Sequence, residues 1–174
     1  AHVGLHTAWQ DSTPMVLFVG LIPFEHREKE AFQEFDPHQW FASGAKRVMV
    51  LDHAERASEY VAEAMFAARS GRPGPVVVGL PEDIITRQIE PTVHPEIPVA
   101  GGGMTVEDWK ALESALKESQ KPLFVFGGND WTSQGAQHFT AWLEAHHIPA
   151  AAEWRCEGTV PFDSPSYVGP IGYG

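Results

Sequence analysis

The segment Ala31-Phe32-Gln33-Glu34 stands where a parallel α/β sheet would receive a ligand. The run 15–19 before it is wholly apolar, which is typical of a strand buried on both faces. Open α/β sheets bind ligands beyond the carboxyl ends of their strands. The four residues also fit a purely structural role, as the start of a helix that packs Phe32. Their position favours the functional interpretation.

A second candidate, Gly127-Gly128-Asn129, lies between an apolar strand and a helix. A glycine turn at a helix N-terminus can hold a phosphate, so Gly127 and Gly128 are candidates for cofactor binding. The sequence contains neither G-x-G-x-x-G nor G-K-[S/T], however. A tight turn between strand and helix explains the two glycines more simply.

Other catalytic patterns are missing from the sequence. Nine histidines are present, but none forms H-E-x-x-H, and the adjacent His146 and His147 would point to different faces of a helix. Ser12 and Ser43 lack the G-x-S-x-G context of hydrolases. We therefore expect no metal site and no nucleophilic hydrolysis.

The composition excludes several classes of partner. A formal net charge of −11 argues against nucleic acid, which needs clustered Lys and Arg. No apolar run approaches the roughly 18 residues of a membrane helix, so no membrane partner is expected. Cys156 is the one cysteine, which excludes an internal disulfide and fits a reducing, cytoplasmic compartment. With neither an initiator Met nor a signal peptide, the chain is expected to be a fragment.

The first part of the chain alternates strands and helices, which predicts a parallel sheet. Asp36 and Pro37 begin a short helix that runs to Phe41. A capping box of Asp52 and Glu55 is predicted for a longer helix, which Gly71 ends. The remaining predicted elements are a helix at 3–10, strands at 15–19, 48–51 and 76–80, and a final turn at 81–84. The predicted apolar face of the longer helix is Ala57, Tyr60, Val61, Ala64, Met65 and Ala68.

Residues 86–103 are rich in proline and glycine and lack periodicity, which predicts a linker. A second unit begins with Thr105, which caps a helix together with Asp108. Its further predicted elements are strands at 123–126 and 148–152 and a helix at 133–146 that buries Ala136, Phe139, Trp142 and Leu143. The tail, 158–174, is expected to end without a further element. Two strands do not make a stable doubly wound sheet, so truncation or a completing partner is expected.

Several motifs occur together in the order and spacing of acetolactate synthase-like thiamine-diphosphate enzymes, and the chain resembles that family. The most specific are Ala31-Phe32-Gln33-Glu34 and Ser70-Gly71-Arg72-Pro73-Gly74-Pro75-Val76-Val77-Val78. The others are Asp11-Ser12-Thr13-Pro14-Met15-Val16, Gly20, Pro23, Lys46, Leu80-Pro81 and Asp83. Lys121-Pro122 with Gly127-Gly128, and Ser164-Pro165 with Gly169 and Gly172, resemble parts of the family's central domain.

The resemblance implies an α/β fold class, with a parallel-sheet pyrimidine-binding domain followed by part of a Rossmann-like central domain. Residues 1–85 would be the C-terminal part of the pyrimidine-binding domain, 86–103 the linker and 104–174 the N-terminal part of the central domain. The parent enzyme would be a 2-oxo acid decarboxylase or carboligase, a lyase or transferase. It would bind thiamine diphosphate and Mg²⁺ between two subunits, as a homodimer or homotetramer. Some relatives also bind FAD in the central domain.

The same resemblance implies which residues border the active site. Phe32 and Gln33 match positions beside it, and Pro23 and Lys46 match positions at its entrance or edge. Phe32 would pack against substrate or cofactor, Gln33 would donate an amide hydrogen bond, and Lys46 would attract a carboxylate. Leu21 departs from the family, whose synthases usually have Gln after the glycine that Gly20 matches.

The family's catalytic Glu and its Gly-Asp-Gly metal segment match no position in this chain. We therefore expect no catalytic residue within it, no tightly bound cofactor and no activity of the fragment alone. Two alternatives stay open. A non-catalytic α/β module would bind FAD or NAD at Gly127 and Gly128. An interaction protein derived from the family would keep these motifs without the chemistry.

Overall fold

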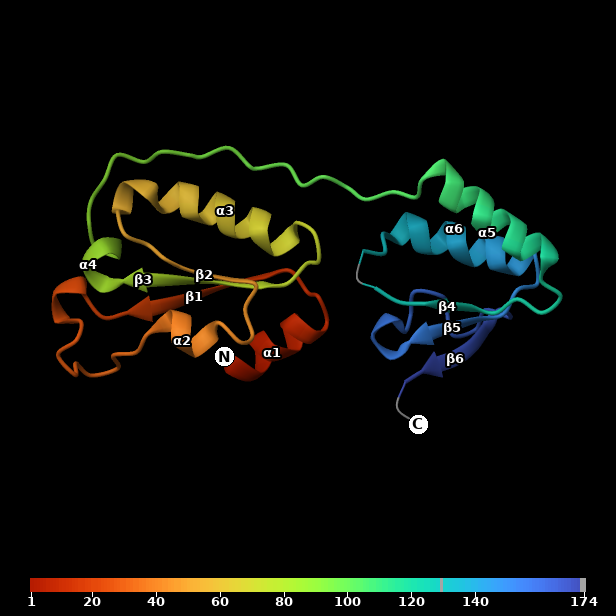
Figure 1. The fold of residues 1–174 in the computed structure, drawn as a ribbon, viewed down its shortest axis with the longest axis horizontal. Coiled ribbons are helices and arrows are strands. Elements are labelled where there is room, and N and C mark those ends of the chain that lie inside the picture. The colour runs from red at the N-terminus through yellow and green to blue at the C-terminus, as the bar shows by residue number, and fades with distance from the viewer. Residues whose placement is uncertain (129, 173–174) are drawn as a thin grey trace. The chain divides into compact units, whose positions relative to one another are not determined.

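The computed structural model describes residues 1–128 and 130–172. The chain forms two compact units, Ala1–Ala100 and Gly101–Gly174, and each contains one three-stranded parallel sheet (Figure 1). The predicted α/β fold class with parallel sheets is therefore confirmed.

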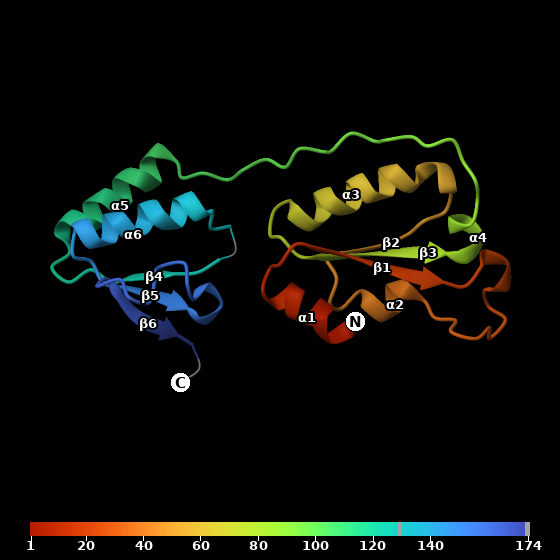
Figure 2. The same ribbon diagram turned by 180° about the vertical axis from the view of Figure 1, so that it is seen from behind.

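The sheet of the first unit is covered by helices on both faces (Figures 1 and 2). Its strand order is β1-β3-β2, so β3 lies in the centre. The elements are α1 (His2–Gln10), β1 (Met15–Leu21), α2 (Pro37–Phe41), β2 (Arg47–Val50), α3 (Ala57–Arg69), β3 (Pro75–Pro81) and α4 (Glu82–Ile85). Each strand and helix predicted for this unit is present, with ends shifted by a few residues.

The central strand β3 organises two cores because its side chains alternate between the faces of the sheet. Val76 and Val78 pack with three alanines of α3, namely Ala64, Ala67 and Ala68. Val77 points to the opposite face, where it packs with Leu5 of α1 and Phe41 of α2. Burial on both faces explains why 76–78 is a continuous valine run.

The start of α3 corrects one prediction. A short 3-10 helix, Ala54–Arg56, precedes it, and neither helix has a side-chain cap, so the Asp52–Glu55 capping box is wrong. Asp52 instead accepts hydrogen bonds from the Arg56 guanidinium. The predicted apolar face is buried only in part, since Val61 and Met65 are 43% and 44% exposed.

The turn between α3 and β3 is fastened to the end of α1. Gly71 has a φ of +56°, a left-handed conformation that glycine adopts without steric cost. Arg72 Nε donates to Ser12 Oγ at 2.7 Å, and Arg72 Nη2 donates to the Trp9 carbonyl at 3.1 Å.

The residues after α4 contain no helix or strand up to α5. Part of this segment lies along α3, where the His94 backbone N donates to Ser58 Oγ and Arg69 pairs with Glu96.

The second unit has strand order β4-β5-β6. Its elements are α5 (Val106–Glu118), β4 (Phe124–Phe126), α6 (Ser133–Ala145), β5 (Ala150–Glu153) and β6 (Tyr167–Ile171). The expectation of only two strands and of a tail without an element is wrong, because β6 pairs with β5. Gly169 and Pro170 are untypical of a strand, so the sequence did not indicate β6. The strand lies at the edge of the sheet, where proline is tolerated.

Both helices of the second unit lie on the same face of its sheet (Figure 1). The Thr105–Asp108 capping box predicted for α5 is confirmed. Leu143 of α6 is fully buried against Phe126 and Ile148, whereas Phe139 and Trp142 are partly buried. Val125 and Val168 are 59% and 58% exposed. The core of this unit is therefore one-sided.

Candidate functional site

A groove of about 480 Å³ lies at the carboxyl edge of the first sheet. Leu21 from the end of β1 and Val50 from the end of β2 contribute apolar walls, and Arg27, His38 and Asp52 contribute polar ones. The loop after β1 and the start of α2 complete it. This is the edge at which open α/β sheets receive ligands.

Leu21 forms a packed wall of this groove and is only 8% exposed. An added Cβ at Gly79 of β3 would lie 2.6 Å from Leu21 Cδ1, so the glycine makes room for the leucine. At the position where the resemblance would place an amide side chain, the site is therefore apolar.

The carboxylate of Glu34 fastens the loop between β1 and α2. Its Oε1 accepts from the Glu28 backbone N, and its Oε2 accepts from the Ala31 backbone N at 3.0 Å. The bond from Glu28 is the main reason that the pKa of Glu34 lies below its ordinary value. Sequence reasoning placed Glu34 in a motif but missed this role, because no pattern marks a carboxylate that binds its own loop.

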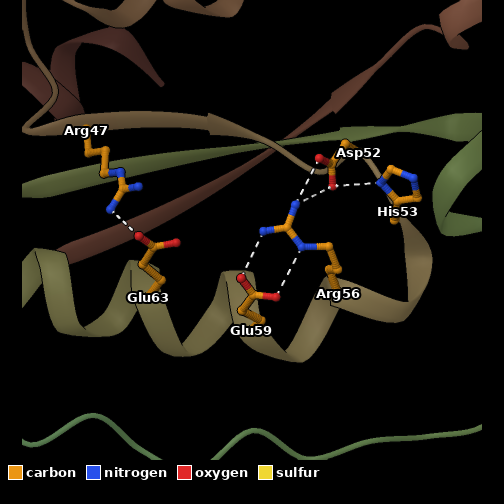
Figure 3. A network of polar contacts seen from close by, with 6 residues as sticks. All are labelled: Arg47, Asp52, His53, Arg56, Glu59 and Glu63. Carbon is orange, nitrogen blue, oxygen red and sulfur yellow. Dashed lines mark hydrogen bonds and ion pairs between the residues drawn. The ribbon is translucent and has the colours of Figure 1, made fainter.

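A second set of charges follows the end of β2 (Figure 3). The Arg56 guanidinium donates to both carboxylate oxygens of Asp52, at 3.2 and 3.0 Å, and to both of Glu59, at 3.1 and 2.8 Å. Burial alone would raise the pKa of Asp52, but a hydrogen bond with His53 and the charge of Arg56 lower it. The Arg56 hydrogen bond also lowers the pKa of Glu59. Sequence reasoning missed this network because it assigned Asp52 to a helix cap.

Two further polar groups of the groove, those of Asp36 and Arg27, have local partners. Asp36 caps α2 as predicted, because its Oδ1 accepts from the backbone N of His38 at 2.8 Å. The Arg27 guanidinium lies 3.8 Å from the centre of the Phe24 ring, a cation–π contact. The carboxylates of Glu34, Asp36 and Asp52, which line the groove, thus serve the local structure.

Three of the four predicted bordering residues lie on this edge. Pro23 begins the loop, immediately before the 3-10 helix Phe24–His26. Phe32 is 88% exposed, so the alternative in which it packs into the core is wrong. Gln33 is also exposed, with a left-handed φ of +64°. Phe32 and Gln33 project from the loop beside the groove and do not line it.

Lys46 lies at the opposite, amino edge of the same sheet. It precedes β2, and its backbone N donates to the Pro75 carbonyl at 2.7 Å, where β3 begins. Its ammonium donates to the Ser70 carbonyl. Within this unit the structure does not bring Lys46 together with Phe32 and Gln33.

Gly127 and Gly128 shape a turn after β4. A Cβ at Gly127 would lie 3.3 Å from Glu153 Cβ, and Gly128 has a φ of +89°. The Gly128 carbonyl accepts from the buried thiol of Cys156. The helix α6 starts only at Ser133 and is capped by Thr132. Asn129, the third residue of the candidate motif, lies outside the described residues.

Two negative findings concern residues 1–128 and 130–172. Nowhere in these ranges do three or more His, Cys, Asp or Glu side chains gather so that they could hold a metal ion. No helix in the described part of the chain is long and apolar enough to cross a membrane.

Comparison with known proteins gives a family for the chain. Residues 110–174 match the family described as thiamine pyrophosphate enzyme, central domain. The chain is 30% identical to the acetolactate synthase large subunit of Lactococcus lactis, over 99% of this chain and 31% of that protein. It is 32% identical to the acetolactate synthase isozyme 2 large subunit of Escherichia coli K12, over 97% of this chain and 31% of that protein.

A third relative carries a different activity in its name. The chain is 30% identical to the glyoxylate carboligase of Escherichia coli O157:H7, over 97% of this chain and 29% of that protein. The chain thus spans less than a third of the length of each of these relatives. The matches favour the predicted family over a nucleotide-binding module. With its two parallel α/β sheets, the chain belongs to the family of thiamine-diphosphate enzymes related to acetolactate synthase.

Proposed function

We propose that the chain works as a segment of a thiamine-diphosphate-dependent 2-oxo acid decarboxylase or carboligase. The observation that carries this proposal is similarity over at least 97% of the chain to two acetolactate synthase large subunits and a glyoxylate carboligase. In this proposal residues 1–85 belong to the pyrimidine-binding domain, 86–103 are the linker and 104–174 belong to the central domain.

The first unit would contribute one border of the active site. Thiamine diphosphate supplies an electron sink for cleaving or joining 2-oxo acids, and the protein supplies orientation. Phe32 would offer its exposed ring to substrate or cofactor, and Gln33 would donate an amide hydrogen bond. Pro23 would fix the start of their loop. We propose no substrate contact for Lys46 from within this unit, because its ammonium is bound at the other edge of the sheet.

The remaining parts of the catalytic machinery would come from outside this chain. The family's Gly-Asp-Gly metal segment is not found in the sequence, so we propose that Mg²⁺ and the diphosphate are held elsewhere in the enzyme. We also propose a cytoplasmic homodimer or homotetramer. Gly127 and Gly128 serve the turn after β4, and we propose no FAD contact there.

The test begins with the coding sequence on either side of residues 1–174. We expect a Glu in the preceding part and a Gly-Asp-Gly segment in the following part. The complete protein should then consume pyruvate or another 2-oxo acid only when thiamine diphosphate and Mg²⁺ are added. The 174-residue chain alone should show no turnover. Absence of both segments, or a complete protein without cofactor-dependent turnover, would contradict the proposal.

A further inference from the structure

The loop that carries Phe32 and Gln33 has an unusual backbone. In this segment, named here the Arg27–Glu34 loop, Glu28, Glu30 and Gln33 have φ values of 61°, 53° and 64°. Left-handed backbone is disfavoured for residues that carry a Cβ, because the Cβ crowds the carbonyl oxygen. Since none of the three is glycine or asparagine, other contacts must hold the loop in this conformation.

One side chain supplies most of these contacts. The two carboxylate oxygens of Glu34 bind backbone N–H groups at both ends of the stretch 28–31, those of Glu28 and Ala31. The Glu34 backbone N also donates to the Ala31 carbonyl at 3.0 Å, which closes a turn around Phe32 and Gln33. Lys29 adds a further tether through its ammonium, which donates to the Glu25 carbonyl at 2.7 Å.

The consequence is a fixed direction for Phe32. Its ring is 88% exposed at the carboxyl edge of the sheet, where burial in the apolar part of the neighbouring groove would otherwise be favoured. We infer that Glu34 is a positioning residue, whose carboxylate holds the Arg27–Glu34 loop so that Phe32 and Gln33 project from this edge. The partner that they meet there rests on the function proposed above, whereas the geometry of the loop does not.

The charge of Glu34 makes this role dependent on pH. Its pKa lies below the ordinary glutamate value because ionised oxygens accept the backbone hydrogen bonds, so the loop is held at neutral pH and released in acid. Other charged groups surround it and must be separated from it in any titration. They are Glu28, Lys29 and Glu30 on the loop, and Arg27, Asp36, His38 and Asp52 around the groove.

An acid titration of the 174-residue chain tests the inference directly. The observed signals are the backbone amide resonances of Glu28 and Ala31 and the ¹⁹F resonance of Phe32 in chain labelled with fluorophenylalanine. The variants are Glu34→Gln and the matched control Glu30→Gln, which removes one charge from the same loop. Wild type and control should show all three signals titrating together, with an apparent pKa below the ordinary glutamate value.

Glu34→Gln should abolish the shared titration and accelerate hydrogen exchange of the Glu28 and Ala31 amides by roughly tenfold or more, because the charged acceptor is lost. Unchanged titration in Glu34→Gln would overturn the inference. A Phe32 signal that does not follow the two amides would overturn it as well.

The link to activity is measured in the complete enzyme by double-mutant cycles. Glu34→Gln should lower kcat/KM in the wild-type background and lower it by a smaller factor when Phe32 or Gln33 is already replaced by alanine, because Glu34 acts through both side chains. An effect of Glu34→Gln that is independent of both alanine substitutions would overturn the inference while the proposed function stands. A shared titration in a protein without thiamine-diphosphate-dependent turnover would remove the proposed function and leave the role of Glu34 in the loop intact.

Discussion

Arg72 shows at the residue scale how one side chain joins segments that are distant in sequence. Its fork binds Ser12 Oγ and the Trp9 carbonyl, and its guanidinium lies 5.7 Å from the centre of the Trp9 ring. Lysine keeps the charge but cannot reproduce this geometry. The Ser70–Val78 motif therefore ends a helix and also ties the turn before β3 to the end of α1.

We predict that Arg72→Lys lowers the free energy of unfolding by about 1 kcal/mol, which is the net contribution expected from one or two exposed hydrogen bonds. Urea denaturation of the chain measures the change. The control is the same substitution in a Ser12→Ala background, where one partner is already missing and the loss should be smaller. Equal losses in both backgrounds would show that the bond to Ser12 contributes nothing.

The Asp52–Arg56–Glu59 network predicts a pH dependence. The pKa values of Asp52 and Glu59 are lower in the folded chain than their ordinary values. The stabilisation of the folded state by these two carboxylates is therefore complete at neutral pH and is lost as the pH falls through their pKa values. The difference in Tm between wild type and Arg56→Gln should therefore shrink on acidification.

Salt should shrink the same difference at neutral pH, because all three side chains are partly exposed. Arg87→Gln serves as the control, since the Arg87 guanidinium donates to the Asp83 carbonyl and not to a carboxylate. Its Tm difference from wild type should not change with acidification. A constant difference for Arg56→Gln would refute the role of the network.

At the scale of elements, the close approach of β3 to its neighbours depends on Gly79. A Cβ there would lie 2.6 Å from Leu21 Cδ1 and 3.3 Å from Val50 Cγ2, one on each flanking strand. The side chains of β1 and β2 therefore meet over this glycine. The packing also sets the apolar walls of the groove, which both residues line.

We predict that Gly79→Ala destabilises the chain by about 1–3 kcal/mol, the usual effect of overpacking a core. Gly20→Ala is the matched control on β1, because a Cβ there meets no atom within 4 Å. Thermal unfolding of both variants measures the effect. Equal stability of the two variants would mean that Leu21 moves aside without cost.

Two helix caps were predictable from the sequence, whereas the start of α3 and the pairing of β6 were not. The Asp36 cap and the Thr105–Asp108 capping box depend on residues within one turn, so their patterns were sufficient. The edge strand β6 was missed because Gly169 and Pro170 resemble a loop until β5 pairs with them. The outward direction of Phe32 was also beyond prediction, because it depends on a carboxylate that binds backbone groups of its own loop.

The strand-end rule predicts the edge of the sheet at which a groove lies, but not the residues that line it. Pro23, Phe32 and Gln33 belong to the loop that follows β1 at the carboxyl edge, but none of the three lines the groove. Lys46 was grouped with them by resemblance alone, and parallel strand order places it at the other edge. The polar residues of the groove entered no prediction as a group, because they come from three separate segments that meet only in the folded unit.

At the scale of the whole molecule, the two units differ in how completely their sheets are covered. Helices flank both faces of the first sheet, whereas α5 and α6 share one face of the second (Figure 2). In addition, α5, all of which the structure describes, buries none of its side chains. Stability follows buried apolar area, so the second unit should be the less stable one.

We predict that the chain unfolds in two steps, with residues 101–174 melting first. Calorimetry of the whole chain measures the two transitions, and residues 1–100 expressed alone should reproduce the higher midpoint. The lower transition should be absent from that shorter chain. One cooperative transition of the whole chain at a single midpoint would contradict independent units.

The buried thiol of Cys156 has a practical consequence. It is 5% exposed, donates to the Gly128 carbonyl, and burial raises its pKa. Because only the exposed thiolate reacts with disulfide reagents, the folded chain should resist labelling at this residue. Because the sequence has a single cysteine, the rate at which such a reagent labels the chain measures how often the second unit opens transiently. The chain thus carries its own kinetic reporter, which requires no engineered label.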